Sequence, residues 1–515
     1  MRNETETGEQ QPLLGEPEND GFADEAVARL GAAPWWVISG AFHALLLLFV
    51  TLIGMAVVRQ IEKPRELFTE IITPDPEPPP PPVRPPAIHD TPIIDPEEPP
   101  VQHVVMITQD RPLADVPQDE EDGEEDSQLG KETGVSDLDF TGTQFTPTLA
   151  PGPGGSSRWG TRTPGNRRRM MRRYGGGGTE SVVARGLAWL ARVQKPDGHW
   201  DTQAFGASVK TDTACTGFAL LAFLGAGHTE KVGKHKDTVR RAVAWLKSKQ
   251  DANGLVFDTT DAGGHRGKGY PHAIAGMALA EAAGMGRYPD TVRAAQRAAD
   301  YSFKTHQQKA GDYEKLGFRY QAGQAGDLSV TGWYVMQLKA AMTSGLHVDQ
   351  TSIDGILRFL NQVEKKAADK GNGYEAPSVY WYQPNNQHAH TAHRLTAMGT
   401  LCRQFLGARK EKLESSVRWF VDKGGLPNAW GEGQTDLYYW YYGTFCTFQQ
   451  GGDTWNRWNE AMKRTFIDNQ RRDGPEDGSW DPVGSYSKEW GRVGQTALSV
   501  LCLEVYYRYL RMYGK

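Results

Sequence analysis

The sequence predicts an all-α fold of about six helical hairpins, preceded by a single transmembrane helix and a disordered Pro-rich linker. From about residue 180 onward one short amphipathic helix pattern recurs at intervals of some tens of residues. Upstream, residues 35–58 contain no Asp, Glu, Lys or Arg, and nearly every second residue from Pro74 to Pro100 is proline. We therefore divide the chain into an acidic N-terminus, a membrane helix, a linker and a helical domain, at 1–34, 35–58, 59–178 and 179–515.

The overall charge excludes one class of partner. The 515 residues carry a formal net charge of −6 at pH 7, so there is no general excess of positive charge to neutralise phosphates, and we expect no nucleic-acid partner. The four cysteines are far apart and form no Cys-x-x-Cys pair. We expect them to be buried thiols that do not report the redox compartment.

The apolar stretch from Trp35 to Val58 is long enough to cross a membrane. As a helix it would rise roughly 36 Å, which exceeds the thickness of a bilayer core. Trp35 and Trp36 stand where an interfacial aromatic anchor belongs, and the 34 residues before them are acidic, unlike the start of a signal peptide. We expect an uncleaved single-pass anchor with the membrane as its partner.

The anchor carries a polar pair, Ser39 and His43, whose spacing of four places both on one helix face. Such a pair, followed by a proline-rich spacer, resembles the anchor of TonB-like energy transducers. The resemblance implies a proton-driven motor protein as partner, coupled through these two residues, and a periplasmic C-terminal domain. In contrast, the basic residues that follow the span favour a cytoplasmic C-terminus, and His43 could simply be tolerated near the interface.

The linker has three compositions in sequence. Its proline-rich part predicts extended polyproline II, which would hold the following domain some tens of Å from the bilayer. An acidic run at 119–126 then excludes a core. The linker ends in a cluster of arginines at 167–173 before Gly175. We interpret this cluster as a boundary tether; the alternatives are contacts with anionic lipid, nucleic acid or the acidic run itself.

The helical domain repeats two kinds of helix. In the amphipathic kind, Val183, Leu187, Leu190 and Gln194 recur at the same offsets as Val239, Val243, Leu246 and Gln250. Each is followed by a turn with Gly and an aromatic residue. A second, more apolar helix follows each turn, at 213–226, 271–283, 330–342, 390–406, 437–449 and 493–509. The spacing alone does not decide between an open solenoid and a closed ring.

The turns carry a family resemblance. Gln194 to Trp200, with Asp197-Gly198 between them, resembles the QW-type motifs of squalene and oxidosqualene cyclases, and so does the segment 470–480. Residues 491–498, Gly-Arg-Val-Gly-Gln-Thr-Ala-Leu, resemble the last inner helix of prenyltransferase/squalene oxidase repeat proteins. The resemblance covers about residues 180–512 and implies a terpenoid-cyclase-like α/α toroid, in which the apolar helices form the inner ring.

The resemblance does not extend to the cyclase acid. Squalene-hopene-type cyclases protonate an alkene with an Asp-x-Asp-Asp-Thr-Ala motif, and the matching stretch here, 209–214, retains only Asp212 of the acids. Thr211 stands where the protonating acid would be, and a threonine cannot protonate an alkene. We therefore expect a membrane-anchored toroid that binds a ligand or partner without cyclase chemistry, and we expect no cofactor.

Polar residues near the starts of the inner helices are the remaining candidates. If the toroid is instead an enzyme acting on an isoprenoid or a glycan, its acid and base would be among Asp212, Asp327 and Asp436. The candidate ligand-binding residues are His272, Trp381, Tyr438, Tyr439 and Arg492. For each, a helix-terminal charge or a core contact is the alternative. The histidine group His388, His390 and His393 is a candidate zinc site.

Overall fold

The computed structural model describes residues 159–261, 267–307, 316–367, 376–386 and 392–513, together with His43. The chain divides into two compact units, 1–114 and 115–515. In the first unit only His43 is described, as an exposed residue in helical conformation. Apart from His43, the predicted membrane span, including Ser39, therefore lies outside the described residues. No helix of the described part is both long and apolar enough to cross a membrane.

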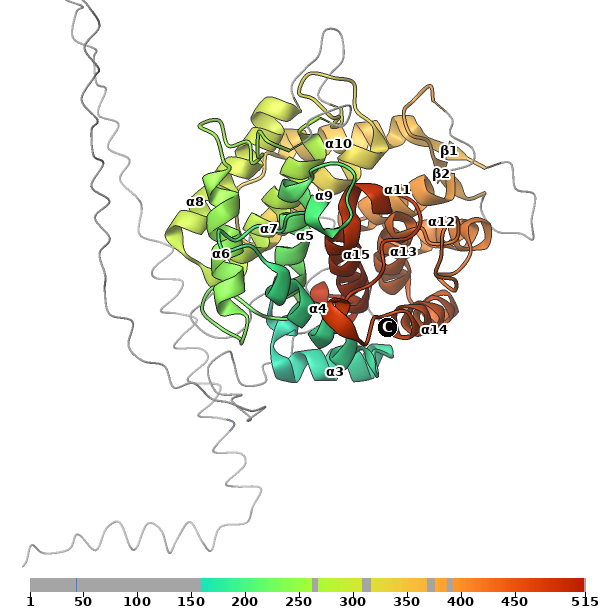
Figure 1. The fold of residues 1–515 in the computed structure, drawn as a ribbon. Coiled ribbons are helices and arrows are strands. Elements are labelled where there is room, and N and C mark those ends of the chain that lie inside the picture. The colour runs from blue at the N-terminus through green and yellow to red at the C-terminus, as the bar shows by residue number, and fades with distance from the viewer. Residues whose placement is uncertain are drawn as a thin grey trace, which may run out of the picture. The chain divides into compact units, whose positions relative to one another are not determined.

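Six helices of the second unit are apolar on most of their faces and form its inner layer (Figure 1). They match the apolar segments predicted from the sequence, and small residues let them approach closely. A Cβ atom at Gly276, for example, would lie 2.3 Å from the side chain of Gln337. The inner helices are α5 (Asp212–Gly225), α7 (Gly269–Gly286), α9 (Leu328–Thr343), α11 (Ala392–Phe405), α13 (Leu437–Gln450) and α15 (Ser487–Leu503).

Six amphipathic helices form the outer layer and alternate with the inner ones along the chain. Each buries one apolar stripe; in the second of them Val239, Val243 and Leu246 are fully buried, whereas Asp237 and Arg240 are exposed. The outer helices are α4 (Thr179–Val193), α6 (Lys236–Ser248), α8 (Pro289–Asp300), α10 (Gln350–Val363), α12 (Lys410–Gly424) and α14 (Gly452–Asp468).

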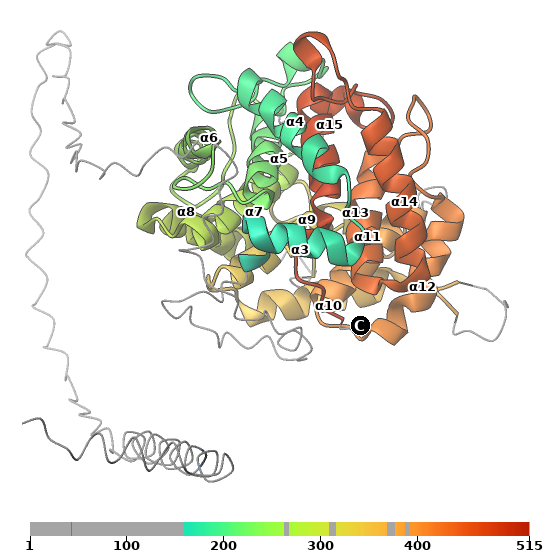
Figure 2. The ribbon, with the colours of Figure 1, turned by 90° about the horizontal axis from the view of Figure 1, so that it is seen from below.

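The inner helices close into a ring. Each packs against the next in chain order, and α15 packs back against α5, so the last repeat meets the first. Figures 1 and 2 show α15 and α5 side by side in both views. This contact decides the question that the repeat spacing left open, because an open solenoid would keep its ends apart. The predicted all-α toroid of helical hairpins is confirmed for the described residues.

The minor elements lie in the connections. Strands β1 (Glu364–Lys366) and β2 (Ser378–Tyr380) pair antiparallel between α10 and α11, with Lys365 opposite Val379. Three short helical turns join other elements, and α16 (Val505–Arg508) follows α15. The turns are η2 (Gln203–Phe205), η3 (Tyr301–His306) and η5 (Gly474–Glu476).

Residues before the predicted start of the helical domain also pack on the toroid. We placed the start of the helical domain at residue 179, but η1 (Gly160–Arg162) and α3 (Pro164–Tyr174) already pack on the toroid, where α3 contacts α16. Met170 and Met171 are buried in this contact. The surrounding arginines hide this short apolar stripe in the sequence, and Gly175, at φ 82°, ends the helix. Figure 2 shows α3 crossing in front of the inner helices.

Aromatic side chains fill the middle of the ring. The indole of Trp333 in α9 lies 5.2 Å from the ring of Phe218 in α5 and 5.2 Å from the ring of Tyr441 in α13. Neither α5 nor α13 neighbours α9 in the ring, so this side chain spans the centre. Trp333 is only 2% exposed. The described inner helices therefore enclose a packed aromatic core at this level.

A polar and aromatic mouth as the candidate functional site

The inner helices begin at one common end of the ring, named here the mouth. Contacts between their starts show this: the Thr211 hydroxyl donates to the Glu489 carbonyl at 2.7 Å, and the Tyr438 hydroxyl donates to the Ser329 carbonyl at 3.3 Å. These contacts join α5 to α15 and α13 to α9. The candidate acids of the sequence, at the starts of α5, α9 and α13, therefore share one end of the toroid.

Asp212 is fully buried and faces the first turn. Its Oδ1 accepts hydrogen bonds from the backbone and the hydroxyl of Thr202, at 2.9 and 2.8 Å. Its Oδ2 lies 3.5 Å from Lys210 Nζ and 3.7 Å from His199 Nε2. These partners all belong to residues 199–210, so the carboxylate ties the first turn to α5.

Two residues near Asp212 were not singled out in the sequence. His199 lies between two carboxylates, because its Nδ1 is 2.6 Å from Asp197 Oδ1 while its Nε2 faces Asp212. Asp261 accepts hydrogen bonds from the backbone of residues 212 and 213, at 3.1 and 2.9 Å, and caps α5 from a distant loop. Burial raises the pKa of Asp261 to about 6. His199 could have been noticed from its place in the Asp-Gly-His-Trp turn at 197–200, whereas the sequence carries no comparable indication for Asp261.

Asp327 caps α9 and is fully buried. Its Oδ1 accepts from the Val330 backbone at 2.9 Å and from the Ser329 hydroxyl at 2.6 Å. Its Oδ2 lies 3.1 Å from Arg319 Nη1. Burial raises the pKa of Asp327, although the hydrogen bonds and the guanidinium act in the opposite direction. The arginine in turn lies over the ring of Tyr382, 5.4 Å from its centroid.

Asp436 has a similar capping role on α13. Its Oδ1 accepts from the Tyr439 backbone at 3.1 Å, and its Oδ2 forms an ion pair with Arg394. Arg394 also donates to the hydroxyl of Ser485 at 3.3 Å, in the loop before α15. Through Arg394, Asp436 thus links the starts of α11 and α13 to the loop before α15. This agrees with the alternative that Asp436 is a helix-terminal charge.

Partly exposed aromatic residues surround these acids. Tyr486 and Trp490 stack at 5.7 Å with an interplanar angle of 20°, and Tyr438 packs against both, at 5.6 and 6.4 Å. Except for Tyr438, which is 8% exposed, these residues are half-buried. Tyr486 has a positive φ of 67°, a strained conformation for a tyrosine that local packing must hold.

The aromatic surface continues across α9 to α7. The Tyr270 hydroxyl donates to the Ser329 hydroxyl at 2.6 Å, next to the Asp327 carboxylate, and its ring lies 5.8 Å from that of Tyr320. The hydroxyls of Tyr320 and Tyr382 are 2.6 Å apart. We name the whole set the aromatic arc: Tyr270, Tyr320, Tyr382, Tyr438, Tyr486 and Trp490. Of these residues only Tyr438 is among the ligand-binding candidates predicted from the sequence, although the others also lie near inner-helix starts or in the turns before them.

Two other aromatic candidates have different surroundings. Tyr439 is 1% exposed and its hydroxyl donates to the carbonyls of Phe420 and Gly425, at 2.9 and 3.1 Å, so it anchors α12. Trp381 is half-buried beside β2, with Lys365 Nζ 4.9 Å from the centroid of its ring. In each case these partners belong to connections or outer helices.

His272 occupies a structural position. Its Nδ1 accepts from the Val256 backbone at 3.0 Å, and its Nε2 lies 3.2 Å from the Ala298 carbonyl. Burial lowers its pKa to about 3, so the ring is neutral. In four other repeats the backbone N–H of an aromatic residue in the turn donates to a threonine hydroxyl of the following inner helix. The donor and acceptor pairs are Trp200 and Thr216, Phe318 and Thr331, Tyr380 and Thr396, and Trp480 and Thr496. His272 thus takes the place of this threonine.

Arg492 faces the turn before α15. Its guanidinium forms ion pairs with Asp481 at 2.7 Å and Glu476 at 3.2 Å. It also donates to the Ser479 hydroxyl at 3.1 Å. Gly491, at φ 56°, kinks the chain just before it. The arginine therefore holds the last turn onto α15.

The zinc candidates are described only in part. His388 and His390 lie outside the described residues. His393 is half-buried against Tyr439, with ring centroids 5.0 Å apart, and burial lowers its pKa. Within the described ranges no group of three or more His, Cys, Asp or Glu side chains could hold a metal ion. The zinc site stays a prediction.

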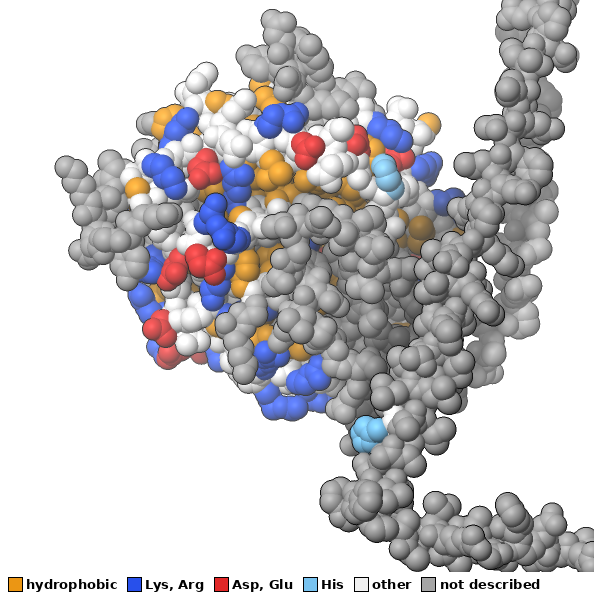
Figure 3. All heavy atoms as spheres, turned by 180° about the vertical axis from the view of Figure 1, so that it is seen from behind, with side chains coloured by type: hydrophobic (Ala, Val, Ile, Leu, Met, Phe, Trp, Pro, Cys, Tyr) orange, Lys and Arg blue, Asp and Glu red, His pale blue; other side chains and the backbone are white. Residues whose placement is uncertain are grey.

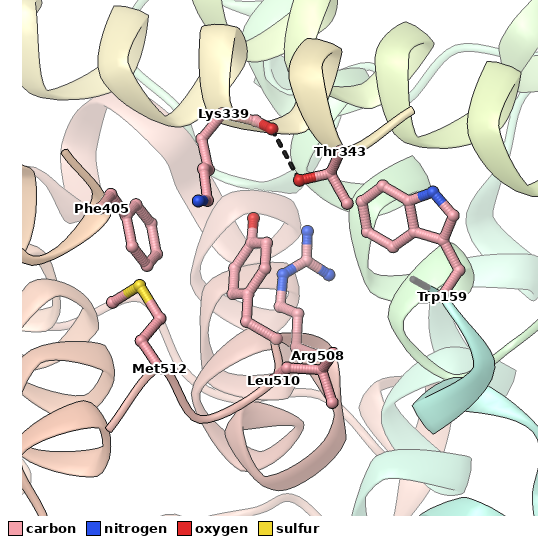
Figure 4. Close-up of a pocket in the computed structure, with 8 residues that line it drawn as sticks. Trp159, Lys339, Thr343, Phe405, Arg508, Leu510 and Met512 are labelled. Carbon is pink, nitrogen blue, oxygen red and sulfur yellow. Dashed lines mark hydrogen bonds between the residues drawn. The ribbon is translucent and has the colours of Figure 1, made fainter. Parts of the chain in front are cut away.

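The opposite end of the ring is closed by a buried ionic cluster. Glu281 pairs with Arg162 at 2.7 Å and with Arg508 at 3.0 Å, and all three side chains are at most 1% exposed. Beside them a pocket of about 20 Å³, room for roughly one water, is lined by Trp159, Lys339 and other residues (Figure 4). Burial raises the pKa of the neighbouring Glu504 well above its usual range.

Comparison with solved structures gives distant similarities of fold. A protein described as a novel alpha-amylase, from Clostridium perfringens, is 13% identical, with a TM-score of 0.45 over 64% of this chain and 99% of its own. Cellobiose 2-epimerase from Bacillus thermoamylovorans is 12% identical, with a TM-score of 0.45 over 66% of this chain and 100% of its own. A type II terpene cyclase from Scytonema is 13% identical, with a TM-score of 0.39 over 66% of this chain and 99% of its own.

The described fold is an α/α toroid. Similarities this low say nothing about activity, and the ring of contacts among the inner helices carries the assignment. No family model matches the chain, and no curated protein matches its sequence. The resemblance of the anchor and spacer to TonB-like transducers finds no support in these comparisons.

Proposed function

We propose that the toroid is a ligand-binding domain without squalene-cyclase chemistry, and that its ligand is a saccharide bound at the aromatic arc. The observation that carries this proposal is the half-buried, stacked pair Tyr486 and Trp490 at the mouth, continued by further tyrosines. Amphipathic aromatic rings of this kind present an apolar face and a polar edge to a ligand.

Two features count against an isoprenoid held inside the ring. Trp333 occupies the centre of the ring, where a polyisoprenoid would have to lie. Thr211, which stands in place of the cyclase acid, has its hydroxyl bonded to the Glu489 carbonyl. A proton donor and a large apolar cavity are both needed to start and enclose alkene cyclisation.

Polar groups beside the arc suit a hydroxyl-rich ligand. Arg319 and the phenol groups of Tyr320 and Tyr382 supply donors and acceptors next to the rings. A sugar ring can stack its C–H face on an aromatic side chain while its hydroxyls bond to such neighbours. A purely apolar ligand would displace water from these half-buried polar groups and offer them no new hydrogen bonds, which is costly.

The test is isothermal titration of the full chain in detergent with a panel of neutral and acidic oligosaccharides. We expect at least one to bind, and Trp490→Ala to weaken its binding by about tenfold, the effect of losing roughly 1.4 kcal/mol. Trp419→Ala, a half-buried tryptophan on outer helix α12, is the matched control and should bind normally. Equal affinity in the two variants would refute the assignment of the arc.

A glycan-active enzyme is the second candidate, favoured by the position of Asp327. This carboxyl lies next to the arc, and burial raises its pKa, as a general acid requires. Asp327→Asn should then abolish turnover of the bound saccharide while leaving its affinity within a fewfold. If saccharide binds and no product forms with the native chain, the domain only binds.

We also propose that residues 35–58 anchor the chain in a membrane, on the sequence observations alone. The native chain should resist alkaline carbonate extraction, and removal of 35–58 should release it. Protease treatment of intact spheroplasts would report the side: cleavage of the toroid supports an exported domain, and protection supports a cytoplasmic one. Coupling to a proton-driven motor needs His43, so His43→Ala should abolish co-purification with such a complex.

A further inference from the structure

Helix α3 presents two unlike faces. Its apolar face, with Met170 and Met171, is buried against α16. On the other side Arg168 and Arg172 are exposed, and Arg169 is half-buried. These three arginines are named the basic face. The helix is only 11 residues long, so their charges lie within about 16 Å along its axis.

The basic face lacks compensating charge in the described part of the protein. Arg167, one position before it, pairs with Glu180 at 2.8 Å. No ion pair is present for Arg168, Arg169 or Arg172 among the described residues. A nearby cation adds to the field, because Lys463 Nζ donates to the Gly175 carbonyl at 2.7 Å at the end of α3. Basic side chains in blue lie along the lower edge of the toroid in Figure 3.

The basic face is also held rigidly in place. The indole of Trp455 donates to the Tyr174 carbonyl at 3.3 Å, and the Asn459 side chain donates to the Gly175 carbonyl at 3.1 Å. The Thr161 hydroxyl binds the Tyr507 carbonyl at 2.7 Å. Both ends of α3 are thus fixed to the toroid. A fixed cluster of arginines costs less entropy on binding a partner than a cluster on a flexible tail.

The same chain contains a segment of complementary charge. Residues 119–126 contain seven acidic residues in eight positions and no basic one. Thirty-two residues, 127–158, separate this segment from Trp159, where the described fold begins. As the disordered linker that the sequence predicts, 32 residues would have an end-to-end distance of roughly 30 Å, which lets the segment reach α3. Tethering holds its effective concentration near the millimolar range.

We propose that the acidic segment 119–126 docks on the basic face of α3. The contact would rest on several guanidinium–carboxylate pairs, which recognise each other in forked geometry, and it would weaken as salt is added. Docking loops residues 127–158 back and shortens the reach between the proline-rich spacer and the toroid. It also keeps the basic face from anionic lipid, which would otherwise compete for the same arginines.

The test measures the distance between segment and helix in the full chain, in uncharged detergent. Spin labels are placed through Gly123→Cys in the segment and Glu460→Cys on α14, near the end of α3. The native cysteines are at most 2% exposed and do not take the label. Pulsed electron resonance should show a narrow, short distance population at about 50 mM salt that broadens at about 500 mM.

Two sets of neutralising variants test the charges. Changing the seven acids to Asn and Gln should remove the short population, whereas Asp75→Asn, Glu77→Gln, Glu97→Gln and Glu98→Gln should preserve it. Arg168→Gln, Arg169→Gln and Arg172→Gln should also remove it, and exposed Arg457→Gln with Arg464→Gln on α14 should not. If the triple arginine variant fails to fold, the acid variant decides alone.

The lipid alternative is separated by vesicle binding. We expect the acid-neutralised chain to bind phosphatidylserine vesicles several-fold more tightly than the native chain, because its basic face is uncovered. The proposal is overturned if the short population is absent from the native chain in detergent, or if it survives neutralisation of the seven acids. Equal vesicle binding by the two chains likewise contradicts it and assigns the face to lipid.

Discussion

The side-chain amide of Gln470 donates a hydrogen bond to the main-chain carbonyl of Val182 at 2.8 Å, across 288 positions of sequence. The same amide also binds the Gly478 carbonyl of its own turn, at 2.9 Å. Gln194 and Gln250 make equivalent pairs of bonds to their own turns and to the next outer helix, 44 positions on. The last turn thus binds the first outer helix in the same way as the turns at Gln194 and Gln250 bind the next outer helix, which is what a closed ring requires.

Gln470→Leu should destabilise the toroid by about 2 to 4 kcal/mol. Gln470 is 4% exposed, and the change removes its two hydrogen bonds to buried main-chain carbonyls, each loss costing about 1 to 3 kcal/mol. The free energy of unfolding in urea measures this loss. Gln434→Leu, at an exposed position, serves as the control and should stay within about 0.5 kcal/mol of the native value. A loss no larger than that of the control would show that the ring closes without this bond.

Trp333→Ala should open a cavity at the centre of the ring. Removing a buried tryptophan costs about 3 to 5 kcal/mol, because transfer energy and packing are both lost. The apolar cavity should then take up benzene, which would raise the melting temperature of the variant in benzene-saturated buffer. Trp419→Ala is the control for the size of the substitution. Benzene stabilisation of the native chain to the same extent would show that the centre is not filled.

His272 should make stability fall as the solution becomes acidic. Its folded pKa of about 3 lies below the ordinary 6.5, so the unfolded chain binds the extra proton. Its contribution is fully present above pH 6.5 and is lost toward pH 3, by about 1.4 kcal/mol per pH unit. His272→Gln keeps an acceptor and a donor but does not titrate. The stability of the native chain relative to this variant should therefore decrease with acidity between these limits, in denaturant titrations at several pH values.

The contribution of Asp261 to stability should depend on pH with the opposite sign to that of His272. Its folded pKa of about 6 lies above the ordinary 3.8, so the folded chain binds the extra proton. Its contribution is present at low pH and is lost as the pH rises from about 4 to 6. Asp261→Asn should remove that part of the profile. If the difference in stability between the native chain and each of the two variants does not change with pH, the buried environments of His272 and Asp261 are contradicted.

Glu281→Gln should be among the most destabilising single changes in the toroid. It leaves Arg162 and Arg508 buried with less compensating charge, and breaking a buried ion pair costs about 3 to 5 kcal/mol. Glu460→Gln removes an exposed pair with Arg464 on α14 and should cost less than about 0.5 kcal/mol. Thermal unfolding of both variants measures the contrast, and similar melting temperatures would argue against a structural role for the cluster.

Part of the candidate site could be predicted from the sequence. Asp212, Asp327 and Asp436 follow from their places at helix starts, because a helix N-terminus favours an acidic side chain. The arc could not be predicted as a unit, since Tyr270 and Trp490 are joined only through contacts with α9 and α13. His272 looked like a candidate ligand-binding residue, and only its bonds to two neighbouring segments reveal the role it shares with threonines of other repeats.

The sequence by itself determined the kind and order of the inner and outer helices of the toroid, because periodicity and turn residues act over short distances along the chain. Only the tertiary structure decided that the repeats close on themselves, that Trp333 fills the centre, and that Trp159 to Tyr174 belong to the fold. Those features depend on contacts between residues far apart in sequence. Their strength depends on which side chains exclude water together, and helical periodicity carries no information about that.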